Sequence, residues 1–307
     1  MIYLNKYIFF TSLGLFILEN FFLIFKEEIN LRRFFSFVLS LLLVNIFYKI
    51  KDKNYYLPFH LFIFFLLLLY YQPIQTIIYS SEGVPLPVVI SLISILLNIM
   101  NRYQNLSLTL TLLSLIIFIG FYFENRTLVV SIMLFIIFKL TSFMAFKKIL
   151  KIPIFYSIIF PIGSIFLIMY IGSLYQNFRL LGLRDYIWSV VLFGEEFSAQ
   201  FYITALDAYK NLDYRHFIES NVHSNFVGLF SRLHIITAIS SLGLLHILVK
   251  HSFKSHISNW RVQFSLFILI NQSLFSGRSF FSLDDLSIVW WLGFFGIVNQ
   301  KKKSLIT

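Results

Sequence analysis

The feature that most constrains this chain is a series of apolar runs, most of them close to the length that crosses a lipid bilayer as one helix and the last two shorter. A helix needs about 20 predominantly apolar residues to span a hydrocarbon core of about 30 Å. Ten such runs are separated mostly by short connections, and they cover residues 7–25, 34–48, 55–71, 84–100, 106–123, 127–146, 152–175, 226–249, 262–275 and 286–298. The sequence therefore predicts an all-α, polytopic transmembrane helical bundle of about ten spans, with residues 1–307 forming a single integral membrane domain. Pro161 and Gly163 predict a kink in the seventh span.

The low content of charged residues supports a lipid-facing surface. Charged residues make up 13% of the chain and hydrophobic residues 58%, whereas soluble domains carry about 25% charged residues. The chain has no cysteine, which excludes disulfides, thiolate zinc sites and a cysteine nucleophile. The formal net charge of +11 does not indicate a nucleic-acid partner, because the basic residues lie in small clusters at the ends of apolar runs.

The same basic clusters predict the orientation of the spans. With a cytoplasmic N-terminus, about fourteen Lys and Arg residues fall on the inner side and about nine on the outer side, four of these in one long loop. The inner set is Lys6, Lys49, Lys51, Lys53, Arg102, Lys147, Lys148, Lys151, Lys250, Lys254, Arg261, Lys301, Lys302 and Lys303. Both termini are therefore expected in the cytoplasm. The first run is expected to stay as an uncleaved span, because small residues at a cleavage-like spacing do not follow it.

One long connection, residues 176–225, differs in composition from the rest of the chain. It carries four basic residues, six acids and two histidines, and loops of this length are usually functional or disordered. An apolar helical stripe argues against disorder; it consists of Leu180, Leu181, Leu183, Ile187, Trp188, Val190, Val191 and Leu192. We expect an ordered, partly helical loop on the outer face of the membrane.

Several ionisable residues near this loop are candidates for a site. Arg215, Glu219 and His223 stand at i, i+4 and i+8, so one helical face can gather them, although a solvated polar face with one ion pair explains the spacing equally well. Arg232 and His234 lie about two turns inside the eighth apolar run. An ionisable group within a span is expensive and is a functional candidate by default; the alternative is a packing role near the interface.

Three short motifs in this region carry a resemblance to a known family. The segment Leu183-Arg184-Asp185-Tyr186-Ile187-Trp188 is followed by Leu192-Phe193-Gly194-Glu195-Glu196-Phe197 and, after a gap, by Val222-His223-Ser224-Asn225-Phe226. This order resembles the O-antigen polymerase and O-antigen ligase superfamily. There, a long outer-face loop carries an Arg and an Ile-Trp pair, then a glycine turn, then a His at the start of the next helix. The resemblance covers residues 180–248.

The resemblance implies a GT-C-like fold and a glycosyltransferase of the bacterial cytoplasmic (inner) membrane. Such an enzyme polymerises oligosaccharide repeat units carried on undecaprenyl diphosphate, to make O-antigen, capsule or exopolysaccharide, often with a chain-length regulator protein as partner. It implies Arg184 beside the diphosphate, because a guanidinium binds phosphate oxygens bidentately. The second cation would be Arg215, Arg232 or Arg278, and Trp188 and His234 would help to bind substrate. His223 would be the general base, with Glu219 to orient it, and this scheme requires no metal and no cofactor.

Three other functions are compatible with the sequence. A ligase that moves a finished glycan to another acceptor has the same sequence features. A transporter or flippase is expected to place polar residues near the midplane of two repeated halves, and the chain has no convincing internal repeat. A non-catalytic scaffold is a further alternative. The acidic pairs Glu195-Glu196 and Asp284-Asp285 are expected to be solvated and not to hold a divalent cation.

Overall fold

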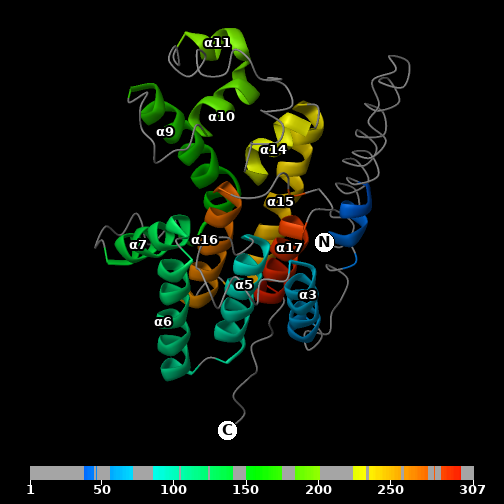
Figure 1. The fold of residues 1–307 in the computed structure, drawn as a ribbon, viewed down its shortest axis with the longest axis vertical. Helices are drawn as coiled ribbons and strands as arrows, with labels where there is room; N and C mark the ends of the chain where they lie inside the picture. The colour runs from blue at the N-terminus through cyan, green and yellow to red at the C-terminus, as the bar shows by residue number, and fades with distance from the viewer. Residues whose placement is uncertain are drawn as a thin grey trace. The chain divides into compact units, whose positions relative to one another are not determined.

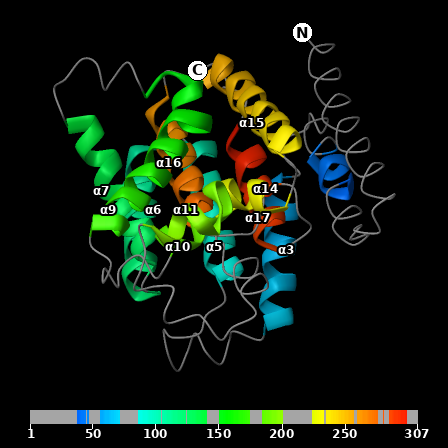
Figure 2. The same ribbon diagram turned by 90° about the horizontal axis from the view of Figure 1, so that it is seen from above.

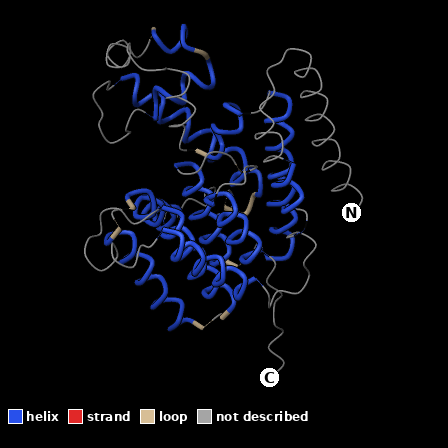
Figure 3. The backbone as a smooth tube through the Cα atoms, turned by 45° about the vertical axis from the view of Figure 1, so that its right-hand side comes forward, coloured by secondary structure: helices blue, strands red, loops and turns tan. Residues whose placement is uncertain are grey.

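The structure is a computed structural model. It describes residues 38–44, 46, 56–71, 86–103, 105–123, 125–140, 150–174, 184–200, 224–232, 235–256, 259–275, 280 and 285–298. Within these ranges the chain is helical and contains no strand (Figure 3). Its contacts divide the chain into two compact units: unit 1 comprises residues 1–38, 154–248 and 273–282, and unit 2 comprises residues 39–153, 249–272 and 283–307.

The helices of unit 2 agree closely with the predicted apolar runs. They are α3 (Tyr56–Tyr71), α5 (Leu86–Arg102), α6 (Leu106–Tyr122), α7 (Arg126–Leu140), most of α16 (Trp260–Phe275) and α17 (Asp285–Val298) (Figure 1). The connection between α5 and α6 is short, and the Asn105 side chain caps α6 by accepting a hydrogen bond from the Ser107 amide at 2.9 Å. Helices α5 and α6 follow each other in the sequence and pack against each other.

Unit 2 is built around α5, α16 and α17. Nearly every described side chain of α16 from Val262 onward, and of α17 from Val289 onward, is buried. The indole N–H of Trp290 donates to the Leu269 carbonyl at 2.9 Å and so joins α17 to α16. A Cβ added to Gly293 of α17 would lie 2.8 Å from the Ser94 hydroxyl oxygen of α5. Small residues therefore allow α17 to approach α5 closely.

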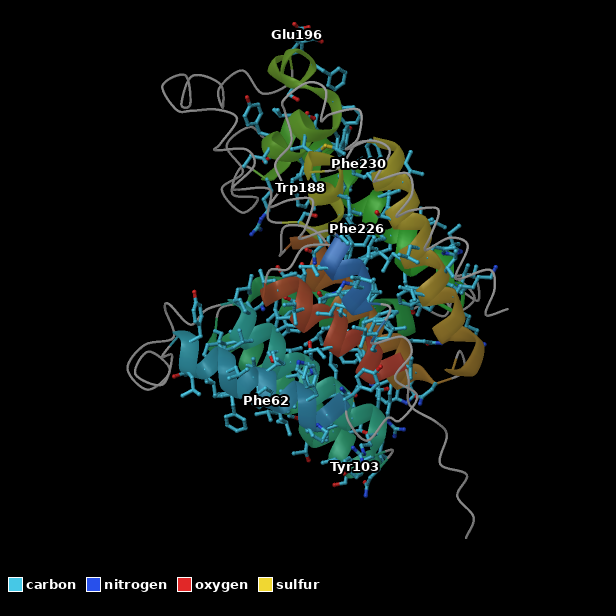
Figure 4. The ribbon with its side chains drawn as sticks, turned by 90° about the vertical axis from the view of Figure 1, so that its right-hand side faces the viewer. Phe62, Tyr103, Trp188, Glu196, Phe226 and Phe230 are labelled. Carbon is cyan, nitrogen blue, oxygen red and sulfur yellow. The ribbon has the colours of Figure 1, made fainter. Side chains whose placement is uncertain are left out.

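The peripheral helices of unit 2 turn apolar side chains outward, whereas its interior contains polar ones. Figure 4 shows Phe62 of α3 projecting away from the unit, and its side chain is 56% exposed. The other exposed large apolar residues of α3, α6 and α7 are Phe59, Leu61, Phe65, Leu66, Leu69, Tyr70, Leu106, Leu110, Leu115, Ile117, Phe118, Phe121, Tyr122, Val130, Met133, Ile136 and Ile137. A soluble monomer rarely exposes an apolar surface of this extent.

Unit 1 brings together helices that are distant in the sequence. These are a π-helical turn, η1 (Phe155–Ile159), followed by α9 (Phe160–Leu174), α10 (Arg184–Phe193), α11 (Glu195–Ala199), α14 (Asn225–Arg232) and α15 (Ile235–His256) up to Leu248. Helix α10 packs against α9, α11 and α14. The view in Figure 2 shows α10 and α11 beside each other. The Phe226 ring packs edge-on against the Phe280 ring, with 4.8 Å between ring centroids.

The irregularity expected near Pro161 is the π-helical turn that precedes it. Proline has no N–H, so residue 161 cannot donate to the Ser157 carbonyl as an α-helix would require. The Phe160 amide instead donates to the Phe155 carbonyl, five residues earlier. At the same turn, the Ser157 hydroxyl and the His246 Nδ1 atom of α15 are hydrogen-bonded at 2.8 Å. The π-turn therefore coincides with a polar link between two helices of unit 1.

Two predictions about the spans need correction or restriction. The run 226–249, expected as one span, is divided between α14, which ends at Arg232, and α15, which begins at Ile235. The charged and imidazole side chains at positions 232 and 234 mark the place where the apolar run is interrupted.

Among the described residues, one helix, Phe155–Leu174, is long and apolar enough to cross a membrane, and the other apolar helices have 10–17 residues. The first predicted run lies outside the described residues, and of the second only residues 38–44 and 46 are described.

Candidate functional site

Helix α10 contains the Arg-x-x-Ile-Trp motif and lies inside unit 1. Its first half is buried on all sides, except for the half-buried Arg184 at its first position. Burial lowers the pKa of the Arg184 guanidinium from its usual value. Arginine nevertheless stays charged near neutral pH. A cation that is partly removed from water interacts more strongly with a phosphate than a fully solvated one.

Asp185, one of the six acids of the long connection, is buried. Its side chain is 8% exposed. Burial raises the pKa of its carboxyl group, while hydrogen bonds from the backbone N–H groups of Tyr186 and Asp185 oppose this increase. The carboxyl group lies directly against Gly172 of α9, where an added Cβ would collide with it. Only glycine at position 172 therefore leaves room for this acid between α9 and α10.

Trp188 is completely buried. Figure 4 shows it within unit 1, with Glu196 at the outer end of α11. The indole packs inside the unit, and substrate contact stays a prediction for this residue. Two aromatic rings nearby are more accessible: Phe193 and Phe197 are each 45% exposed, and their ring centroids are 5.2 Å apart. Phe166 of α9 extends this set, with its centroid 6.1 Å from that of Phe193.

A glycine turn joins α10 to α11, as the family resemblance implies. Gly194 has a φ of +90°, a conformation that residues with a side chain rarely adopt. The Ser198 hydroxyl donates to the Gly194 carbonyl at 2.8 Å, and the Ser189 and Ser198 hydroxyl oxygens are 2.7 Å apart. These contacts fix α11 against the end of α10 and present Phe193 and Phe197 on one surface.

Helix α14 begins at Asn225, two residues after His223, and packs against α10. Ser224 is fully buried, and its hydroxyl oxygen accepts a hydrogen bond from the Val227 amide at 3.3 Å, which caps the helix. Asn225 is also buried, and its Oδ1 atom has no hydrogen-bond partner in the part of the chain that the structure describes. Segments about 40 residues apart in the sequence therefore meet at α10 and the start of α14.

The structure describes three of the eight predicted site residues. Arg184 and Trp188 lie on α10, and Arg232 is the last residue of α14, where its backbone is described but its side chain is not. The other five lie outside the described residues: Arg215, Glu219, His223, His234 and Arg278. Their proximity to Arg184 stays a prediction. Within the described ranges, no group of three or more His, Cys, Asp and Glu residues is arranged to hold a metal ion.

Sequence reasoning missed two sets of residues. Asp185 was counted as a loop acid, and nothing in its local sequence reveals Gly172 as its neighbour. His60 of α3 and the serine and asparagine residues of α5 are buried inside unit 2. The sequence did contain a signal for His60, because an ionisable residue within a predicted span is a functional candidate by default.

In comparisons with family models, with curated proteins and with solved structures, nothing matches this chain.

Proposed function

We propose that this protein is a membrane glycosyltransferase that polymerises undecaprenyl-diphosphate-linked repeat units on the outer face of the bacterial cytoplasmic membrane. The observation that carries the proposal is the packing of α10 against α14. It joins the helix that holds Arg184 and Trp188 to the helix that begins at Asn225, two residues after His223. The Arg184 and Ile187-Trp188 motif and the Asn225-Phe226 end of the last motif thus lie on helices that pack against each other.

The distribution of side chains in unit 2 supports a membrane location. Phenylalanine, leucine and isoleucine point outward from α3, α6 and α7, and serine, asparagine and glutamine are buried in α5 and α16. This is the arrangement expected when the surrounding solvent is hydrocarbon, because polar groups there must find partners inside the protein. The bundle of about ten spans, with both termini in the cytoplasm, belongs to this proposal.

In the proposed reaction a hydroxyl oxygen of the acceptor sugar attacks the anomeric carbon of the donor glycan. The new C–O bond forms as the bond between the anomeric carbon and the diphosphate oxygen breaks, and the diphosphate leaves with the electron pair. Arg184 stabilises the negative charge that grows on the leaving group. His223, oriented by Glu219, takes the proton of the attacking hydroxyl. The exposed rings of Phe193 and Phe197 offer apolar faces on which sugar rings can stack.

Deleting the gene in its own host tests the class of the enzyme. A polymerase deletion should leave one repeat unit on the final carrier, whereas a ligase deletion should leave none, as seen on a gel of the extracted polysaccharide. Full-length polymer in the deletion strain would contradict both functions. A transporter deletion should instead accumulate the lipid-linked unit on the inner side of the membrane.

Substitution of Arg184 tests the site. Arg184→Lys keeps a positive charge but loses the bidentate geometry, and we expect loss of long chains at a normal protein level. Losing one such electrostatic contact typically costs about 10²–10³ in rate. Arg102→Lys, on an exposed arginine at the end of α5, is the matched control and should leave chain length unchanged. A normal ladder from Arg184→Lys would remove Arg184 from the site.

A further inference from the structure

One face of α5 is polar although the helix lies in the interior of unit 2. Ser91, Ser94, Asn98 and Asn101 recur three or four residues apart, so they share one side of the helix. Each side chain is at most 4% exposed. From Ser91 to Asn101 this face extends about 15 Å at 1.5 Å per residue. It therefore covers about half of a hydrocarbon core.

The serine hydroxyls on this face do not bond to their own helix. In α7 of the same unit, the Ser131 hydroxyl donates to the Thr127 carbonyl, one turn earlier. The hydroxyl oxygens of Ser91 and Ser94, by contrast, have no hydrogen-bond partner among the described residues. Ser94 Oγ is directed toward Gly293 of α17. The Ser94 hydroxyl is thus turned into the seam between α5 and α17.

His60 of α3 brings an imidazole to the same region. It is fully buried, and neither ring nitrogen has a hydrogen-bond partner among the described residues. Leu67, in the second half of α3, packs with Val88 and Ile90 at the start of α5, and the first half of α3 also has buried residues. The two helices are therefore antiparallel (Figure 1). His60 lies about 10 Å before Leu67 along the helix axis, which places it level with the middle of the polar face.

The polar face begins at an end of unit 2 where polar side chains are exposed. Asn101 Nδ2 donates to the Ser265 hydroxyl oxygen at 2.6 Å, while Asn101 Oδ1 has no hydrogen-bond partner within the described ranges. The next residues, Arg102 and Tyr103, are exposed. Figure 4 shows Tyr103 at this end of the unit. The buried Asn101 therefore adjoins exposed polar side chains at this end of α5.

The chemistry of these groups defines what they bind. A buried polar atom without a partner costs about 1–3 kcal/mol, and buried polar groups in proteins that lack a protein partner usually bond to ordered water. The face and His60 supply uncharged hydroxyl, amide and imidazole groups, and no carboxylate or ammonium group. Such a set suits the small, uncharged, hydrogen-bonding water molecule better than an ion.

We propose that His60, Ser91, Ser94, Asn98 and Asn101 form a hydrated polar path that leads from the Asn101 end of unit 2 to its middle. Its ligand is a file of water molecules, each bonded to side chains of α3 and α5. The inference rests on the membrane location proposed above, because only in lipid is water inside the bundle distinct from the surroundings. It does not depend on glycosyl transfer.

Because the chain has no cysteine, a single introduced thiol reports the local water. The path variants are Asn101→Cys, Asn98→Cys, Ser94→Cys and Ser91→Cys in the full-length protein, reconstituted in phospholipid vesicles. The exchange of the S–H proton for deuterium is followed by infrared spectroscopy after transfer into D₂O. Leu97→Cys and Ile93→Cys, buried beside the path on the same helix, are controls of matched depth.

We expect all four path thiols to exchange quickly, in order of depth from residue 101 to residue 91. The matched controls should exchange at least about a hundredfold more slowly, because a dry thiol waits for a local opening that costs several kcal/mol. Adding His60→Phe to Ser94→Cys should slow its exchange at least about tenfold, since an apolar ring removes partners that hold the water. Equal rates at path and control positions would overturn the proposal.

Phe118→Cys separates failure of the path from failure of the membrane location. Phe118 is 60% exposed on α6, so its thiol should face lipid and stay protected from D₂O. If this thiol exchanged at once, unit 2 would lie in water and the membrane proposal would fail. If it stayed protected while the path thiols were also protected, the hydrated path alone would fail.

Discussion

Asp185 places a carboxyl group inside unit 1, next to the arginine on which the proposed reaction depends. Burial raises the pKa of this carboxyl group above its usual value of 3.8. The protonated form is therefore favoured in the folded state relative to the unfolded state. The resulting stabilisation is complete below the unfolded pKa and is lost as the pH rises through the folded pKa. At neutral pH the buried carboxylate lowers the stability of the fold.

Asp185→Asn should remove this pH dependence, because the amide keeps the shape of the carboxyl group without its charge. In detergent, the melting temperature of the variant should exceed that of the wild type at pH 7. The two should converge as the pH approaches 4. The control is Glu196→Gln, at an exposed acid on α11, and its melting temperature should equal that of the wild type at both ends of this range. If the difference in melting temperature between Asp185→Asn and the wild type were the same at pH 4 and pH 7, the burial of this group would be contradicted as a source of instability.

At the scale of elements, the contact between α9 and α10 depends on one glycine. An alanine at position 172 would bring its Cβ into the Asp185 carboxyl group, so α10 must move or the acid must change its rotamer. Overpacking of this kind costs about 1–3 kcal/mol. Gly172→Ala is therefore expected to lower the melting temperature and to shorten the glycan chains, since α10 holds Arg184.

Gly163→Ala is the matched control, because it lies on the same helix with nothing within 4 Å of an added Cβ. Alanine is favoured over glycine in a helix by about 1 kcal/mol, so this variant should be as stable as the wild type or more so. A Gly172→Ala protein with the stability and chain length of Gly163→Ala would show that α9 and α10 do not meet closely.

For the molecule as a whole, the positions of the positive charges predict which parts of the chain share a side of the membrane. A phosphatase that is active only outside the cytoplasm should be inactive when fused after residue 307 or in the connection near residue 104. It should be active when inserted between residues 200 and 210, in the long loop. An active fusion at the C-terminus would reverse the proposed orientation.

The bounds of the individual helices of unit 2 could be predicted from the sequence. The bounds of α3, α6 and α17 differ from the predicted runs by a residue or two, because polar residues end each apolar run. Helix α10 and the turn at Gly194 were also foreseen as ordered structure in the long loop. The division of the run 226–249 into two helices was not foreseen, because the mean hydropathy of a window of about 20 residues conceals a break at Arg232.

Contacts between helices were beyond what the sequence could predict. The burial of Asp185 requires Gly172 from another helix, and the polar face of α5 is recognised as interior only when α17 covers it. Trp188 is completely buried, which the sequence also did not reveal; its substrate contact stays a prediction. Periodicity fixes the faces of one helix, and tertiary packing decides what each face meets.

The turn at Phe155–Ile159 holds one residue more than an α-helical turn of the same height. Each residue of an α-helix advances the side-chain direction by about 100°. The wider turn absorbs the rotation that the extra residue would otherwise impose on the flanking helix. Without that residue the turn would regain the α-helical repeat, and Ser157 would lose the direction in which it meets His246.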